Sequence, residues 1–79
     1  MEKYYEIIKE IRTIRGLKNA FKVEYDITRD SIYLNFINSK AFQTLDNENS
    51  KMFKDFSFTC DMNDANYEFK SYGILEIYF

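Results

Sequence analysis

The 79-residue sequence contains no histidine, no tryptophan and no proline, and it has one cysteine and two glycines. Without histidine, the chain cannot by itself form a Ser-His or Cys-His catalytic pair or a two-histidine metal site. The single cysteine, Cys60, excludes an internal disulfide and leaves no ligand set for zinc. The lack of histidine removes the commonest routes to catalysis. The lack of a second cysteine indicates a reducing compartment.

The two glycines, Gly16 and Gly73, lie far apart, and neither precedes a segment with a helical pattern. A glycine-rich phosphate loop is therefore absent, and we expect no nucleotide or other cofactor. The Asp61-x-Asn63 pair is followed by Ala65 where a calcium loop needs a third oxygen ligand, so we expect no metal. The segment Glu2 to Lys18 is charged at almost every turn, which is typical of neither a signal peptide nor a membrane span. We expect a cytoplasmic location.

The formal net charge is −2 and the isoelectric point is about 5.0. Residues 1–29 hold seven basic and five acidic groups, whereas residues 30–79 hold four basic and eight acidic groups. A dedicated nucleic-acid binder of the basic-patch type normally has a domain pI above about 9. The charge therefore argues against nucleic acid as the partner.

The first element expected is an amphipathic helix over Glu2 to Lys18. Its apolar residues Tyr4, Ile7, Ile8, Ile11 and Ile14 follow spacings of three and four, which place them on one stripe. Gly16 predicts the end of the helix, because glycine tolerates the left-handed conformation that closes helices.

From Ala20 the apolar period changes to two, which is typical of half-buried strands. Closing residues 27–30 as a turn predicts a hairpin that sets Tyr25 against Ile32, Val23 against Leu34 and Phe21 against Phe36, with all six on one face.

Two further segments are interpreted as strands. Phe56, Phe58, Cys60 and Met62 alternate with polar residues, and residues 63–66 have turn chemistry, so a second hairpin is predicted with residues 67–79 as its return strand and a bulge or bend at Gly73. Residues 38–55 suit a strand pair or a short helix. The polar cluster of residues 46–50 interrupts any helical stripe and favours strands, with a bulge near Lys54.

These elements predict one domain over residues 1–79 of the α+β class, with one N-terminal amphipathic helix packed on a four- to five-stranded antiparallel sheet. Cys60 occupies an inward-facing position of the predicted strand, between aromatic residues, and we expect it to be a buried core residue.

One catalytic constellation deserves a test. In the predicted second hairpin Asp61 faces Glu68, and Lys70 follows on the same face, which resembles the Asp, Glu-x-Lys signature of metal-dependent nucleases. The alternative interpretation is a solvated set of cross-strand charges. The short turn and the lack of the remaining nuclease core favour that alternative. A minimal magnesium-dependent nuclease is therefore the least favoured function, and we expect that the chain is not an enzyme.

Two surfaces remain as candidates for binding. Four basic residues recur along the end of the predicted helix and form either a strip for an acidic partner or a solvated helix face: Arg12, Arg15, Lys18 and Lys22. The outward parity of the sheet carries large apolar residues where polar ones are expected, namely Tyr33, Ile37, Tyr72, Ile74 and Tyr78. Four acidic residues border it: Asp61, Asp64, Glu68 and Glu76. Such a face meets another protein, a second copy in a homodimer, or the chain's own middle segment.

The sequence thus predicts a non-catalytic protein-binding module that occupies a basic or apolar surface of another protein. The bias towards Phe, Tyr, Ile, Asn and Lys fits AT-rich coding and a low-GC bacterium or its phages. The most concrete version is a small phage- or mobile-element-encoded inhibitor of a host defence protein, similar in kind to anti-CRISPR proteins, acting in the host cytoplasm. The alternative is a small nucleic-acid-binding regulator that uses the basic helix end.

Overall fold

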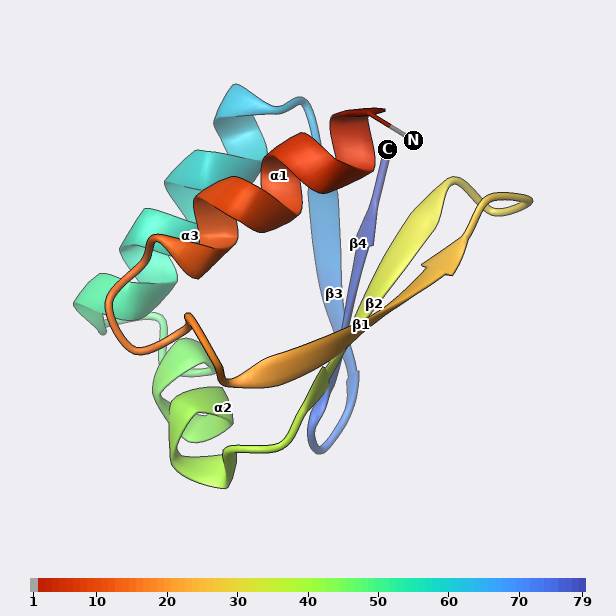
Figure 1. Cartoon of the computed structure of the whole chain (residues 1–79). Helices are drawn as coiled ribbons and strands as arrows, with labels where there is room; N and C mark the ends of the chain where they lie inside the picture. Colours follow the sequence, from red (N-terminus) through yellow and green to blue (C-terminus); the bar gives the residue numbers. More distant parts are fainter. Residues whose placement is uncertain (1) are drawn as a thin grey trace.

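The computed structural model describes residues 2–79. Its elements, in chain order, are α1 (Glu2–Arg12), β1 (Phe21–Asp26), β2 (Ser31–Phe36), α2 (Ser39–Leu45), α3 (Lys51–Met62), β3 (Asn66–Ser71) and β4 (Ile74–Tyr78). The strands form one antiparallel sheet in the order β1-β2-β4-β3. All three helices lie on the same side of this sheet (Figure 1). The predicted α+β class is confirmed, with two helices beyond the one expected.

Helix α1 buries the predicted stripe of Tyr4, Ile7, Ile8 and Ile11. It ends at Arg12 rather than Lys18, because the Thr13 hydroxyl donates to the Glu10 carbonyl at 2.6 Å and the following backbone bonds span three residues. Ile14 remains buried in the turns that follow, and Gly16 adopts a positive φ of 95°.

The first hairpin has the predicted register, with Phe21 opposite Phe36, Val23 opposite Leu34 and Tyr25 opposite Ile32. In its turn, Asp30 has a φ of 53°, a conformation that aspartate tolerates better than most residues. The Asp30 carboxylate accepts hydrogen bonds from Tyr4 and from Lys3, and both lower its pKa. These two hydrogen bonds connect the turn to the start of α1.

The prediction of strands in residues 38–55 is wrong, because this region forms α2 and the start of α3. Asn38 and Ser50 cap the two helices, since their side chains accept hydrogen bonds from the backbone N–H groups of Ala41 and Phe53. The polar residues 46–50 therefore separate two helices instead of joining two strands. The bulge expected near Lys54 is also absent, because Lys54 lies within α3.

The strand expected over Phe56 to Met62 is wrong as well, because these residues belong to α3. Phe56 and Cys60 are fully buried, whereas Phe58 and Met62 are 65% and 67% exposed. Residues four apart share one helix face, so alternate apolar residues on a helix do not all point the same way. The prediction of Cys60 as a core residue is confirmed, and burial raises the pKa of its thiol to about 12.

Residues 66–78 form a hairpin of their own, β3 and β4, instead of the single return strand predicted over residues 67–79. The bend expected at Gly73 is a tight turn through Tyr72 and Gly73, where Gly73 has a φ of 87°. The register of this hairpin shifts between Phe69 and Ser71. Strand β4 also pairs with β2, so it lies in the middle of the sheet. Its inward residues, Leu75 and Ile77, are fully buried under the helices.

Candidate functional site: the open face of the sheet

The helices cover one side of the sheet and leave its other side uncovered (Figure 1). The strand register places alternate residues of all four strands on that other side. We call this surface the open face. It comprises Lys22, Glu24 and Asp26 of β1, Ser31, Tyr33 and Asn35 of β2, Ile74, Glu76 and Tyr78 of β4, and Asn66, Glu68 and Lys70 of β3.

Glu76 is the centre of a polar cluster on this face. The Ser31 hydroxyl donates a hydrogen bond of 2.7 Å to Glu76 Oε2, and the Glu76 side chain is only 4% exposed. The Arg29 guanidinium lies 3.7 Å from Oε2, and the Lys70 ammonium lies 3.7 Å from Oε1. The Ser31 hydrogen bond, followed by the charges of Arg29 and Lys70, holds the pKa of Glu76 below its ordinary value, although burial acts in the opposite direction. The carboxylate is therefore ionised and fixed in place.

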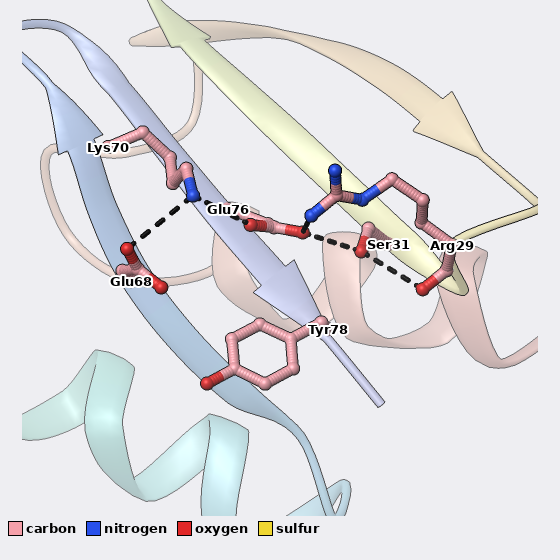
Figure 2. A pocket seen from close by; sticks show the side chains of 6 residues that line it. All are labelled: Arg29, Ser31, Glu68, Lys70, Glu76 and Tyr78. Atoms are coloured by element: carbon pink, nitrogen blue, oxygen red, sulfur yellow. Dashed lines mark hydrogen bonds and ion pairs between the residues drawn. The ribbon is translucent and has the colours of Figure 1, made fainter.

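Lys70 lies between two carboxylates that would otherwise repel each other. Glu68 and Glu76 are directly opposite in the β3–β4 register, where like charges are destabilising. The Lys70 ammonium is 3.5 Å from Glu68 Oε2 as well as close to Glu76, and Figure 2 shows it between the two side chains. The Glu68 side chain remains 57% exposed, so it is the more accessible carboxylate of the pair.

Two hollows lie side by side on the open face. The first, of about 190 Å³, is lined by the charged cluster, Ser31 and Tyr78 (Figure 2). The second, of about 420 Å³, is lined by Glu24, Tyr33, Asn35, Lys70 and Ile74. Lys70 lines both, so the hollows adjoin, and a partner contacting this face would meet a charged region next to a more apolar one.

The structure brings together five of the nine residues predicted for the partner-binding face: Tyr33, Ile74, Tyr78, Glu68 and Glu76. Ile37 follows β2 and is 65% exposed. Tyr72 points to the helical layer instead, since its ring centroid is 5.1 Å from that of Phe42 and its hydroxyl accepts a hydrogen bond from Gln43 at 3.1 Å.

The other two acidic residues lie away from the open face. Asp61 is in the last turn of α3, and Asp64 is in the turn before β3. The open face with the adjoining Arg29 therefore carries three basic and four acidic side chains: Lys22, Arg29 and Lys70, with Glu24, Asp26, Glu68 and Glu76. Its charge is close to balanced.

The predicted basic strip is not one surface. The Arg12 guanidinium lies 4.4 Å from the Phe21 ring centroid and donates to the Lys18 carbonyl at 2.8 Å, so it stabilises the loop after α1. Arg15 lines a hollow with residues of α2 and α3. Lys22 lies on the open face of β1. These side chains point to different parts of the molecule.

The nuclease-like set is not assembled either. Asp61 lies on a helix, and the carboxylate opposite Glu68 is Glu76. Among residues 2–79 no three Cys, Asp or Glu side chains are grouped so that they could hold a metal ion.

Sequence reasoning missed Arg29 and Ser31 as members of the cluster. Ser31 shares the parity of Tyr33, so alternation alone places it on the same face. No sequence signal points to Arg29, because it reaches the cluster from a turn whose side-chain directions follow no fixed period.

None of the helices within residues 2–79 has the length and apolar character needed to cross a membrane. Comparison with known proteins finds no family model, no curated protein and no solved structure that matches this chain.

Proposed function

We propose that this chain is a non-catalytic protein-binding module and that its open face contacts the partner. The observation that carries the proposal is a sheet face on which Tyr33, Ile74 and Tyr78, all partly exposed, surround a fixed polar cluster. Tyrosine is enriched at interface positions that contribute most to affinity, because it combines contact area with a hydroxyl that can still find a partner.

The polar cluster supports the same proposal because it needs no rearrangement on binding. Glu76 already has its hydrogen bond from Ser31 and its ion pairs, so it keeps the side chains around it in position. A preorganised surface loses less side-chain entropy on association than a mobile one. The exposed groups, Glu68 and Arg29, are then available to select the partner.

The balance of charge favours protein over nucleic acid as the partner. Phosphate backbones are bound by surfaces with an excess of lysine and arginine, and the open face has no such excess. Within this proposal, the exposed carboxylate of Glu68 favours a basic group on the partner, and the hollow beside Tyr33 and Ile74 favours an apolar one.

The most concrete form of the proposal remains an inhibitor encoded by a phage or mobile element, acting on a host defence protein. It is supported by the AT-rich composition, the small size and the acidic isoelectric point. A stoichiometric inhibitor needs only one rigid contact surface, and the open face provides one.

Site-specific photo-crosslinking tests the proposal. A benzoylphenylalanine at position 74 lies on the open face, and the same group at position 58 lies on the exposed side of α3. In a low-GC bacterial lysate we expect a discrete protein adduct from position 74 and none from position 58. An adduct from position 58 alone would place the contact on the helical layer and contradict the proposal.

With the captured protein purified, alanine variants measure the contribution of each side chain. We expect Tyr33→Ala and Tyr78→Ala each to weaken binding about tenfold or more, because truncating a tyrosine at a binding hot spot costs about 2 kcal/mol or more. Met62→Ala, on the exposed side of α3, serves as the matched control and leaves affinity unchanged. Equal affinities for all three variants would refute the assignment of the open face.

A further inference from the structure

Strand β1 lies at one edge of the sheet, and no bulge interrupts it. Its six residues pair with β2 in one continuous register. The other edge, β3, is interrupted by a register shift between Phe69 and Ser71. Natural proteins commonly blunt edge strands with bulges or proline, because an unpaired row of backbone groups is a template for another strand. Strand β1 has neither device, although it carries charged side chains, which also blunt edges, at Lys22, Glu24 and Asp26. None of the helices within residues 2–79 runs along its outer side (Figure 1).

The sequence of β1 is complementary to itself in one antiparallel register. Two copies of an edge strand related by a two-fold axis keep their faces aligned only when the axis passes a residue, because side chains alternate with period two. An axis at Val23 places Lys22 opposite Glu24 of the second copy and Phe21 opposite Tyr25. An axis at Lys22 or at Glu24 would instead place identical charges opposite each other.

The charged residues that this register needs are not used within the chain. Lys22 and Glu24 are both exposed, and neither forms an ion pair within residues 2–79. Glu24 accepts one hydrogen bond, from Asn35 of the neighbouring strand at 3.0 Å. Opposite charges directly across two antiparallel strands stabilise the pairing.

The other face of β1 provides apolar groups in the same register. Tyr25 is 40% exposed although it faces the helical layer, and it packs edge-on against Tyr5, which is 55% exposed. The helices therefore leave this end of β1 partly uncovered. In the register centred on Val23, Tyr25 lies opposite Phe21 of the second copy. Phe21 is only 3% exposed, so Tyr25 supplies the exposed apolar surface of this pairing.

We infer that β1 pairs with β1 of a second copy, antiparallel and centred on Val23. The partner is a second copy of this chain, because the same short segment supplies both halves of the charge pattern. The pairing joins two four-stranded sheets into one of eight strands with both open faces on the same side. The inference does not depend on what the open face binds.

Charge exchange tests the inference. By sedimentation velocity over a concentration series, we expect the unaltered chain to dimerise and Lys22→Glu and Glu24→Lys each to raise the dimer Kd at least tenfold, because each places like charges opposite. An equimolar mixture of the two variants should dimerise again as a heterodimer, since opposite charges then face each other. Glu68→Lys, on the other edge strand, is the matched control and should dimerise like the unaltered chain.

A chain that stays monomeric at millimolar concentration would overturn the inference. So would single variants that dimerise as well as the unaltered chain, or a mixture that gains nothing over its components. Loss of the dimer in Glu68→Lys would assign the contact to β3 instead.

The register has its own test. Under mild oxidation we expect Val23→Cys to form a disulfide between two copies, because side chains directly opposite have Cβ atoms about 4.5–5.5 Å apart and a small backbone shift brings them to the roughly 3.5–4.5 Å of a disulfide. Thr28→Cys, in the turn beyond the strand, should not. The native Cys60 is fully buried and does not interfere. Cross-linking at position 28 without cross-linking at position 23 would refute the register.

Discussion

Ser31 and Glu76 lie 45 residues apart in the sequence, and the Ser31 hydroxyl donates a hydrogen bond of 2.7 Å to the Glu76 carboxylate. Both side chains are almost completely buried although they belong to the open face of the sheet. A buried carboxylate is stable only when its charge is compensated, and the compensation here comes from Ser31, Arg29 and Lys70. This contact therefore connects stability to pH.

We predict that the stability of the fold decreases in acid through Glu76. Its pKa in the folded chain is below its ordinary value of 4.5. A carboxyl group whose pKa is lowered by folding contributes stability that is fully present above the ordinary pKa and is lost as the pH falls through the folded pKa. Urea unfolding at a series of pH values should show this loss below about pH 4.5, and Glu76→Gln should flatten it and cost about 1–3 kcal/mol at pH 7.

Two variants separate the contribution of Glu76 from those of other carboxylates. Asp30 also has a lowered pKa, so Asp30→Asn should remove a different part of the acid dependence. Glu68→Gln changes an exposed carboxylate and should alter stability by no more than about 0.5 kcal/mol. An unchanged pH profile in Glu76→Gln would show that the cluster does not hold the ionised carboxylate.

A second prediction compares two phenylalanines on α3. Phe56 is fully buried and Phe58 is 65% exposed. We expect Phe56→Ala to lower the free energy of unfolding by about 3–5 kcal/mol, and Phe58→Ala to change it by no more than about 0.5 kcal/mol. Phe56→Leu should fall between the two, and it remains measurable if Phe56→Ala does not fold. Similar losses at both positions would indicate the strand that simple alternation predicts, where the two side chains share one face.

The same residues explain where sequence reasoning failed. Phe56, Phe58, Cys60 and Met62 alternate as in a strand, but the two that enter the core, Phe56 and Cys60, are also spaced as in a helix. The N-cap hydrogen bond of Ser50 favours the helix over the strand. This cap depends on a single side chain, so the periodicity of the apolar residues does not reveal it. By contrast, the β1–β2 hairpin could be predicted in register, because six apolar residues at period two and a short connection allow only one pairing that places all six on the same face of the sheet.

The candidate site was predictable in part for a similar reason. Alternation alone places Tyr33, Ile74 and Tyr78 on the open face. Joining them into one surface requires β4 to lie between β2 and β3, and strand order is a long-range property that local periodicity does not contain. The grouping of Arg29 with Glu76 depends on that order and on a turn conformation.

A third prediction concerns the N-cap of α3. The Ser50 hydroxyl oxygen accepts a hydrogen bond from Phe53 N at 3.0 Å and donates one to the Thr44 carbonyl at 2.7 Å, so it connects the ends of two helices. Ser50→Ala should cost about 1 kcal/mol or more in urea unfolding, because a cap substitution typically costs 0.5–2 kcal/mol. Ser57→Ala, in the interior of the same helix, is the control and should cost nothing, since alanine favours helix interiors. Equal effects at both positions would show that Ser50 does not act as a cap.

The last prediction concerns the reactivity of Cys60. Its side chain is fully buried, and burial raises the pKa of its thiol to about 12, with the nearby Asp61 charge acting in the same direction. The thiolate is the reactive form of cysteine, so alkylation of the folded chain at pH 8 should be at least about 100-fold slower than that of an ordinary exposed thiol, because each unit of pKa above the solution pH lowers the thiolate fraction tenfold. Met62→Cys introduces an exposed thiol two residues away on the same helix, and in a Cys60→Ala background it should react at the ordinary rate. In concentrated urea the two thiols should become equally reactive, because unfolding removes the burial that distinguishes them. Rapid alkylation of Cys60 in the folded chain would contradict both its burial and the packing of α3 against the sheet.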